Sequence, residues 1–341
     1  MFSDKTLIGL DIGTDSVKMV EIGHSGQAPE LVTYGMAKHS LLLEGYWDST
    51  KLRQLSTIIE DIMSFGNFAG VKTVISVQSK DVYVTTMDFE ASWNKKLIQE
   101  EIDKQAAYFL PYPPDEMRLS WSIIENDPRI KAYTGKQRVI INALPEFVIE
   151  NSKNLLEHVN LDGVALENQT LSQIRSTLNP DNGNTLLVDI GAKQTTFSII
   201  VDGFLRASSH IPVGGAKTSL ELSKSLGIDI TIAENFKRDL NLVNLFSIPK
   251  ELIDTYTVIK SELQTFYELN KKVAQDPQKV VVTGGGILIA GFLEFLKDFP
   301  VPVYLGNCLR NIKVNPDILP YILPQSSSLS TALGLGLKND I

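Results

Sequence analysis

The chain has 341 residues, of which 43% are hydrophobic and 21% are charged, which suits two domains or one bilobed unit and excludes general disorder. Lys and Arg total 32 against 40 Asp and Glu, so the net charge of −8 argues against a nucleic-acid binder. The single cysteine, Cys308, excludes disulfides and iron–sulfur clusters held by this chain alone, and the four histidines show no metal-ligand spacing.

The N-terminal part of the chain has the pattern of strands followed by a helix. Short apolar runs predict strands at 7–12, 17–22, 31–36 and 71–77. Between the last two, apolar residues on one face predict a helix over 52–63, capped by Asp48 or Ser49. The first strand is short and contains Asp11, so we do not expect a signal peptide.

The same order of elements returns in the second half of the chain. Strands are predicted at 185–190, 195–201 and 204–211, and a helix from about 217. Both halves carry Asp-Ile-Gly after the first strand, and the aspartates, Asp11 and Asp189, are 189 − 11 = 178 positions apart. This spacing indicates a duplicated fold, although two coincidental triplets remain the alternative.

Two segments interrupt this pattern. A small mixed unit of strands and one helix is expected over about 77–145, where the 110–114 segment, Leu-Pro-Tyr-Pro-Pro, ends the helix. A mostly helical insert is expected over about 215–278. We therefore divide the chain into lobes at 1–182 and 183–341. The longest uncharged stretch, 318–337, contains Pro320 and Pro324, so no membrane span is expected and we expect a cytoplasmic protein.

The turn after the first strand is a candidate phosphate site. Its polar residues are Asp11, Gly13, Thr14, Asp15, Ser16 and Lys18. A tight turn exposes backbone N–H groups to phosphate oxygens, Gly13 permits close approach, and Lys18 adds a positive charge. Asp11 is placed to face a magnesium ion through water. The alternative is an ordinary polar hairpin.

The second turn offers a matching set of residues, namely Asp189, Gly191, Lys193, Gln194 and Thr195. Two such turns facing each other would hold a polyphosphate and its Mg²⁺ from opposite sides. A third motif, Gly284-Gly285-Gly286-Ile287, follows an apolar strand and precedes a helix expected near 289–297, which would let a ring or ribose approach the backbone. A flexible loop is the alternative, and the spacing fits neither an NAD fingerprint nor a P-loop.

In this order and spacing the three motifs resemble the actin-like ATPase superfamily. The resemblance implies an α/β, duplicated (RNase H-like) fold with two lobes, a small extra α+β subdomain in the first lobe, and ATP and Mg²⁺ as ligands. It also implies connecting helices at 164–177 and 327–337, and further nucleotide contacts at Gly214, Gly215, Glu234 and Lys237. A solvated helix face is the alternative for Glu234 and Lys237.

The match narrows to the family of the type IV pilus assembly protein PilM. The stretches that resemble this family include Leu97–Pro113, with its helix ending in Pro-Tyr-Pro, the 233–238 segment and Thr283–Gly286. Lys193-Gln194 departs from the small residues expected in the second turn. Ala165 stands where an acidic residue is expected, with Glu167 nearby, which leaves a water-activating role open.

The resemblance implies an ATP-binding scaffold at the cytoplasmic face of the inner membrane. Its partner would be the N-terminal cytoplasmic tail of a PilN-like protein, bound in a groove involving the extra subdomain, with the pilus motor ATPases nearby and membrane contact only through partners. Oligomeric state and ATP hydrolysis, slow or none, stay open. A small-molecule kinase and an FtsA-like filament-forming ATPase are the competing functions.

Overall fold

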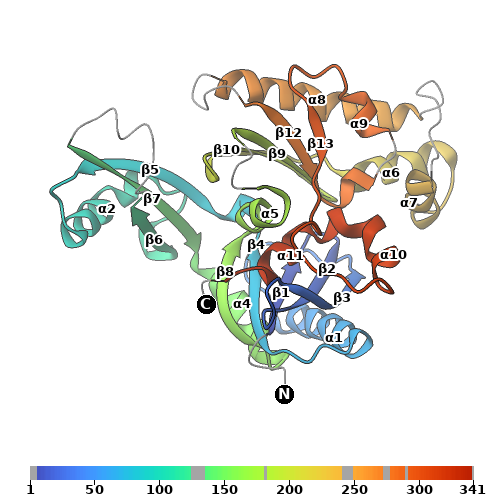
Figure 1. Ribbon diagram of the computed structural model, residues 1–341, viewed down its shortest axis with the longest axis horizontal. Helices are drawn as coiled ribbons and strands as arrows, with labels where there is room; N and C mark the ends of the chain where they lie inside the picture. The colour runs from blue at the N-terminus through green and yellow to red at the C-terminus, as the bar shows by residue number, and fades with distance from the viewer. Residues whose placement is uncertain are drawn as a thin grey trace.

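The computed structural model describes residues 6–123, 135–179, 183–239, 249–271, 277–288 and 291–339. Within them the chain forms two five-stranded sheets and one three-stranded sheet. The two large sheets lie on either side of a central pair of helices, and the three-stranded sheet projects to one side (Figure 1).

The two large sheets have the same topology. The first has the order β3-β2-β1-β4-β8 and the second β11-β10-β9-β12-β13. In each, a meander of three antiparallel strands is followed by two strands parallel to the first. The strands are β1 (Thr6–Ile12), β2 (Ser16–Gly23), β3 (Glu30–Lys38), β4 (Lys72–Val77), β8 (Asp162–Asn168), β9 (Thr185–Ile190), β10 (Thr195–Val201), β11 (Phe204–Ile211), β12 (Lys279–Thr283) and β13 (Val303–Leu305). The duplication therefore extends over a whole five-stranded sheet and is not limited to the Asp-Ile-Gly triplet.

Helices α1 (Ser49–Gly66) and α4 (Glu146–His158) cover one face of the first sheet. Their apolar sides pack on alternate residues of the strands, including Ile8, Leu10 and Ile75, which are almost fully buried. Of the two predicted caps for α1, Asp48 is the one used, because its side chain accepts a hydrogen bond from the Lys51 backbone amide at 2.8 Å. We call this sheet with its helices the first lobe.

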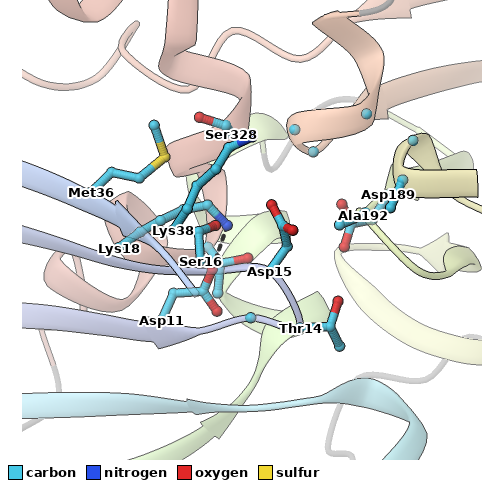
Figure 2. Close-up of a pocket in the computed structure, with 18 of the residues that line it drawn as sticks. Asp11, Thr14, Asp15, Ser16, Lys18, Met36, Lys38, Asp189, Ala192 and Ser328 are labelled. Carbon is cyan, nitrogen blue, oxygen red and sulfur yellow. Dashed lines mark hydrogen bonds and ion pairs between the residues drawn. The ribbon is translucent and has the colours of Figure 1, made fainter. Parts of the chain in front are cut away.

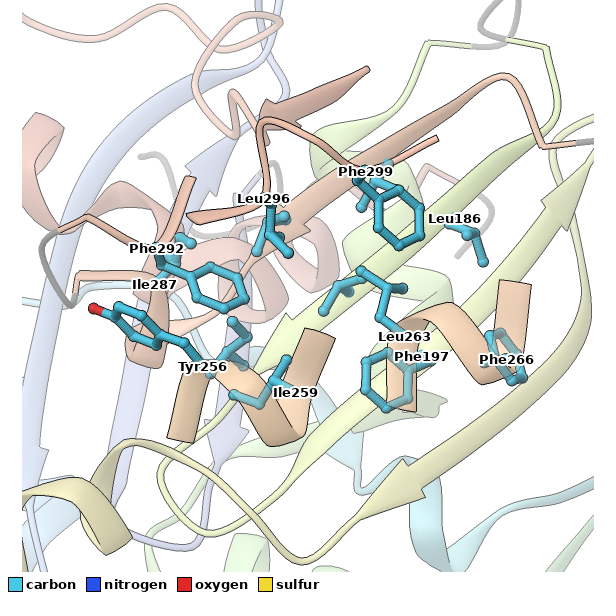
Figure 3. Packing of buried hydrophobic residues seen from close by; sticks show 14 of the residues in the cluster. Leu186, Phe197, Tyr256, Ile259, Leu263, Phe266, Ile287, Phe292, Leu296 and Phe299 are labelled. Atoms are coloured by element: carbon cyan, nitrogen blue, oxygen red, sulfur yellow. The ribbon is translucent and has the colours of Figure 1, made fainter. Parts of the chain in front are cut away.

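The second sheet is covered by α6 (Gly215–Leu226), α7 (Ile230–Asp239), α8 (Lys250–Asn270) and α9 (Phe292–Phe295). Figure 3 shows the aromatic part of this core, in which Tyr256 packs edge-on against Phe292 at 5.1 Å between ring centroids. The predicted helix near 289–297 is wrong in extent: α9 holds four residues, and the glycine run enters the 3₁₀ turn η5 (Gly285–Leu288) instead. Residues 289–290 lie outside the described part. We call this sheet with its helices the second lobe.

Two crossing helices join the lobes. Helix α5 (Gln169–Thr177) packs Ile174 and the following Leu178 on the second sheet, whereas α11 (Ser330–Gly336) packs on the first sheet. The expected helix over 164–177 is wrong in its first turn, because residues 164–168 belong to strand β8, in which 165–168 pair with β4. The second stretch begins as the 3₁₀ turn η6 (Leu323–Leu329) and continues as α11.

The crossing is unusually close because two glycines form it. A Cβ on Gly334 of α11 would lie 1.9 Å from the Ser172 carbonyl oxygen of α5, and a Cβ on Gly9 of β1 would lie 2.0 Å from the Ala332 carbonyl oxygen. Real Cβ atoms essentially never approach so closely, so β1, α11 and α5 can stack at this spacing only with glycine at both contacts.

A third segment also crosses between the lobes. After β13 the chain returns to the first lobe, where Leu31 donates to the Lys313 carbonyl oxygen at 2.9 Å and Lys313 donates to that of Pro29 at 2.8 Å. Cys308, Leu309 and Ile312 of this segment are buried with Val20 and Ile22 of β2, beside α10 (Leu319–Ile322).

The extra subdomain leaves the first lobe after β4 and returns at α4. It consists of η2 (Ser79–Asp81), β5 (Tyr83–Glu90), α2 (Lys95–Phe109), η3 (Pro114–Glu116), β6 (Met117–Ile123) and β7 (Lys136–Pro145). Its sheet has the order β5-β7-β6, and α2, capped by Asn94, buries Ile98 and Ile102 against it. In Figure 1 this unit stands at the left, joined to the rest by two strand ends.

Candidate functional site

A cavity of about 410 Å³ lies between the lobes, with the two duplicated turns on opposite sides. Figure 2 shows Thr14 and Asp15 of the first turn facing Asp189 and Ala192 of the second. The sequence-predicted residues that line it are Asp11, Gly13, Thr14, Asp15, Ser16, Lys18, Asp189, Gly191, Gln194, Gly215, Glu234, Lys237, Gly284, Gly285 and Gly286. Residues far apart in the chain thus meet around one space.

The two turns are closed by equivalent hydrogen bonds. The Gly13 amide donates to the Ser16 carbonyl oxygen at 3.0 Å, and the Gly191 amide donates to that of Gln194 at 2.9 Å. Each bond holds the tip of its turn in a fixed shape at the cavity wall. Such preorganised turns are suited to bind phosphate oxygens through backbone amides.

Asp11 is held by three donors from different elements. Its carboxylate, which is 3% exposed, accepts from Ser76 Oγ of β4 at 2.8 Å, from Gln169 Nε2 of α5 at 3.1 Å and from Lys18 Nζ of β2 at 3.4 Å. This network fixes the carboxylate at the cavity edge and places the Lys18 ammonium over it (Figure 2).

Asp189 is the counterpart of Asp11 in the second turn. Burial raises the pKa of its carboxyl above the usual range, and the nearby Asp11 charge raises it further, while a Gln173 hydrogen bond and the Lys18 charge act the other way. Two carboxylates that repel each other inside a cavity fit a divalent cation, which would relieve both the burial and the repulsion. Within the described residues no group of three or more His, Cys, Asp or Glu that could hold a metal ion is found.

The glycine run is needed for close packing against the second turn. Gly284 has a φ of +94°, and a Cβ there would lie 2.2 Å from Asp189 Oδ1. A Cβ on Gly286 would lie 2.4 Å from Ile190 Cγ2, whereas one on Gly285 meets nothing nearer than 3.6 Å. Gly284 and Gly286 therefore allow the end of β12 to pack beside Asp189, and Gly285 leaves the space open toward the cavity.

Lys237 is buried and ion-paired with the half-buried Glu234, so the alternative of a solvated helix face is wrong for this pair. Lys237 Nζ donates to Glu234 Oε2 at 2.7 Å, to Ser219 Oγ at 2.7 Å and to the Gly215 carbonyl oxygen at 2.9 Å. Only 3% of Lys237 is exposed. The pair fixes α7 against the start of α6, where both residues border the cavity.

Four predicted residues do not line the cavity. Lys193 is exposed at its turn, and Thr195 is buried, donating to the Val213 carbonyl oxygen at 2.8 Å. Gly214 caps α6, where a Cβ would lie 2.6 Å from the Gly191 and Ala192 carbonyl oxygens, and Ile287 belongs to the second-lobe core.

Several lining residues carry no signal in the sequence. They are Met36, Lys38, Gln78, Gln169, Gln173, Ala192, Ala216, Ser219, Ile230, Thr231, Gln325, Ser328, Ser330 and Thr331. The only available hint was the position of the connecting stretches, which places α5 and η6–α11 between the lobes. Glu167, the candidate for water activation, is not among the residues that line the cavity, and Arg175 donates to both of its oxygens at 2.7 Å.

His39 supports the first turn from behind. A carbonyl oxygen only accepts, so the 3.1 Å contact with Gly13 requires a proton on His39 Nε2, and Nδ1 accepts from the Leu41 amide at 3.2 Å. Both ring nitrogens are thus satisfied in the neutral form. Burial lowers the His39 pKa, helped by Lys193 and Lys18 and opposed by the Gly13 bond and Asp15.

We expect His39 to make the protein less stable on acidification. Its folded pKa lies below the ordinary value of about 6.5, so its contribution is complete above 6.5 and is lost as the pH falls towards the folded value. His39→Gln keeps the donor to Gly13 without titrating, so its melting temperature should fall less between pH 7.5 and 5.5. Equal losses in both proteins would contradict this role.

The two lobes, their paired turns and the cavity between them define an actin-like ATPase fold. MreB 5 of Spiroplasma citri bound to AMPPNP aligns with 97% of this chain and 94% of its own at TM-score 0.53 and 15% identity. The chain belongs to the family of the type IV pilus assembly protein PilM, whose family model matches residues 9–340. The predicted fold class and family are confirmed.

Other relatives agree with this placement. A solved PilM–PilN type IV pilus biogenesis complex aligns with 97% of both chains at TM-score 0.81 and 20% identity. The cell division protein FtsA of Buchnera aphidicola is 22% identical over 97% of this chain and 90% of its own, and FtsA of Pseudomonas aeruginosa is 24% identical over 89% and 83%. In the described part of the chain, no helix combines the length and apolar character that crossing a bilayer requires.

Proposed function

We propose that this protein is an ATP-binding scaffold for type IV pilus assembly that holds the N-terminal cytoplasmic tail of a PilN-like protein. The observation that carries the nucleotide part is the cavity, where two equivalent turns and two carboxylates face each other. Family membership supports the pilus part, and the structural likeness to a PilM–PilN complex supports the partner. Membrane contact at the cytoplasmic face of the inner membrane would then come through that partner.

In this proposal each side of the cavity has a task. The amides and hydroxyls of the turns bind phosphate oxygens, and Lys18 adds positive charge beside Asp11. A magnesium ion, when bound, would neutralise phosphate charge, and Asp11 and Asp189 would hold its water shell. Gly285, Glu234 and Lys237 line the part where the nucleoside fits.

The residues around the cavity suit nucleotide binding better than nucleotide hydrolysis. The residues that reach the cavity from the first crossing helix are amides, Gln169 and Gln173, and the carboxylate just before that helix, Glu167, is paired with Arg175. Neutral amides orient water but do not remove its proton. We therefore propose slow or no hydrolysis.

The proposed partner site is a small pocket where the extra subdomain meets the first lobe. We call it the junction pocket; its volume is about 40 Å³, and its walls are Ile12, Leu43, Trp47, Ile75, Ser76, Val77, Gln78, Asp81, Phe147, Val148, Asn151 and Ser152. Both chain crossings border it, since Gln78–Asp81 leads into β5 and Phe147 follows β7.

The loop that supplies Leu43 and Trp47 to the junction pocket also carries exposed apolar side chains. Leu42 is 67% exposed, and Tyr46, 64% exposed, tilts against Phe147 at 5.7 Å between ring centroids. Asn151 fixes this loop by accepting from the Trp47 amide at 3.0 Å and donating to the Gly45 carbonyl oxygen at 2.8 Å. A pocket of this size suits one apolar side chain of an extended peptide.

The test is a calorimetric titration of the Mg²⁺-ATP-loaded protein with a peptide copying the cytoplasmic tail of the PilN-like protein. We expect saturable binding that Phe147→Ala weakens about tenfold or more, as loss of a buried aromatic contact does at interfaces. Phe65→Ala is the matched control, because Phe65 is 87% exposed on α1, and it should bind as wild type. Equal affinities for all three would remove the junction pocket from the proposal, and no binding at all would remove the partner.

A further inference from the structure

Gln78 belongs to the walls of two separate spaces. It lines the cavity between the lobes, and it also lines the junction pocket. No other described residue is a wall of both. Ser76, two residues earlier, donates to Asp11 on one side and lines the junction pocket on the other, so the end of β4 forms the partition between the two spaces.

The side-chain oxygen of Gln78 has no hydrogen-bond partner within the described chain. This Oε1 is buried and accepts no hydrogen bond from any described residue. An unsatisfied buried carbonyl is costly, so a donor from outside the chain would be bound there with a net gain. The cavity that it borders is the one to which we assign a magnesium nucleotide, whose water shell consists of donors.

The backbone at Gln78 is tied to both the subdomain and the crossing helix. Its carbonyl oxygen accepts from the Asp81 amide at 2.9 Å, which closes η2 at the start of the subdomain. Within η2, Ser79 Oγ bonds Asn168 Oδ1 at 3.0 Å and Thr170 Oγ1 at 2.9 Å, at the start of α5. A shift of Gln78 would therefore move η2 with it, together with the wall that Asp81 gives to the junction pocket.

We propose that Gln78 is a positioning residue that couples the nucleotide cavity to the junction pocket. With magnesium nucleotide bound, a donor of the bound ligand satisfies Oε1 and holds the Gln78 side chain on the cavity side. This fixes η2 and the pocket wall in the form that accepts the partner's tail. The inference rests on the proposed function, since it needs a nucleotide in one space and a peptide in the other.

The coupling has a definite sign and size. Nucleotide should tighten peptide binding, and the peptide should tighten nucleotide binding by the same factor, because linkage between two sites is reciprocal. One hydrogen bond gained by a buried acceptor gives a factor of about five.

The experiment uses the full chain and two ligands, Mg²⁺-AMPPNP and the tail peptide, titrated calorimetrically alone and together. The wild type should show about fivefold tighter binding of each in the presence of the other. Gln78→Leu should still bind both, with a coupling factor near one. Gln54→Leu is the matched control, because Gln54 is exposed on α1 and lines neither the nucleotide cavity nor the junction pocket, and its coupling factor should remain that of the wild type.

Hydrogen exchange gives a readout that needs no peptide. Mg²⁺-AMPPNP should slow amide exchange at 41–47 and 146–152 in the wild type and not in Gln78→Leu. A wild-type factor of one with both ligands bound, or unchanged coupling in Gln78→Leu, would overturn the inference. If the peptide does not bind, the exchange result alone tests the coupling through Gln78. If the nucleotide does not bind, both the coupling and the assignment of the cavity to a nucleotide are overturned.

Discussion

Replacing Gly334 with alanine should lower the free energy of unfolding by about 3 kcal/mol, the upper end of what overpacking costs. The new Cβ would lie 1.9 Å from the Ser172 carbonyl oxygen, a backbone atom that moves only if α5 and α11 separate. Helix propensity alone gives the opposite sign, since alanine is favoured over glycine in a helix by about 0.5–1 kcal/mol. The sign of the change therefore distinguishes the crossing contact from intrinsic helix stability.

The measurement is denaturant unfolding of the purified variant, followed by circular dichroism. Gly26→Ala is the matched control, because its Cβ would meet nothing nearer than 3.5 Å, and its stability should stay within about 0.5 kcal/mol of wild type. If Gly334→Ala is as stable as the control, the contact between α5 and α11 accommodates a Cβ atom, and the expected overpacking is contradicted.

The double variant Asp11→Asn with Asp189→Asn should lose the magnesium-dependent part of nucleotide binding, weakening Mg²⁺-AMPPNP by about 100-fold or more. Both carboxylates border the cavity, and losing two charge-assisted contacts of about 1.5–3 kcal/mol each accounts for this factor. Asparagine keeps the shape at Asp11, and its one oxygen still accepts from Ser76 and Gln169, so the first lobe should stay folded.

The assay is calorimetry with and without EDTA. In the wild type, EDTA should weaken binding strongly, whereas in the double variant it should change little. Asp202→Asn, exposed in the turn between β10 and β11, is the control and should behave as wild type. Undiminished magnesium dependence in the double variant would show that the metal is held elsewhere.

Much of the fold could be predicted from the sequence because its local signals agree with its global repeat. The offset of 178 between Asp11 and Asp189 also relates Gly13 to Gly191, and both glycines close their turns with the same bond. Each half of the chain therefore repeats the strand pattern and the turn residues of the other half, so the predicted sheet is supported by two segments of the sequence. The helix expected at 164–177 was misjudged because its first residues pair with β4, a contact that no local pattern reveals.

The site residues on the two turns could be predicted from the sequence, whereas the residues that reach the cavity through packing between elements could not. Thr195 and Ile287 belong to the predicted motifs, but their side chains point away from the cavity: Thr195 donates to the Val213 carbonyl oxygen, and Ile287 packs in the second-lobe core. The glutamines at 78, 169 and 173 could not be predicted, because glutamine residues in a site show no characteristic sequence spacing. Gln78 reaches the cavity from the end of β4, and Gln169 and Gln173 reach it from α5, only once the two lobes have packed together.

The return of the chain to the first lobe after β13 has a consequence for biosynthesis. One face of the first sheet, with Val20 and Ile22, is covered by Cys308, Leu309 and α11, which are made nearly three hundred residues later. Domains generally fold in order of synthesis, but this lobe cannot bury that face until residues 308–337 have left the ribosome. Its nascent form would present an apolar sheet to chaperones until the 308–337 segment packs against it.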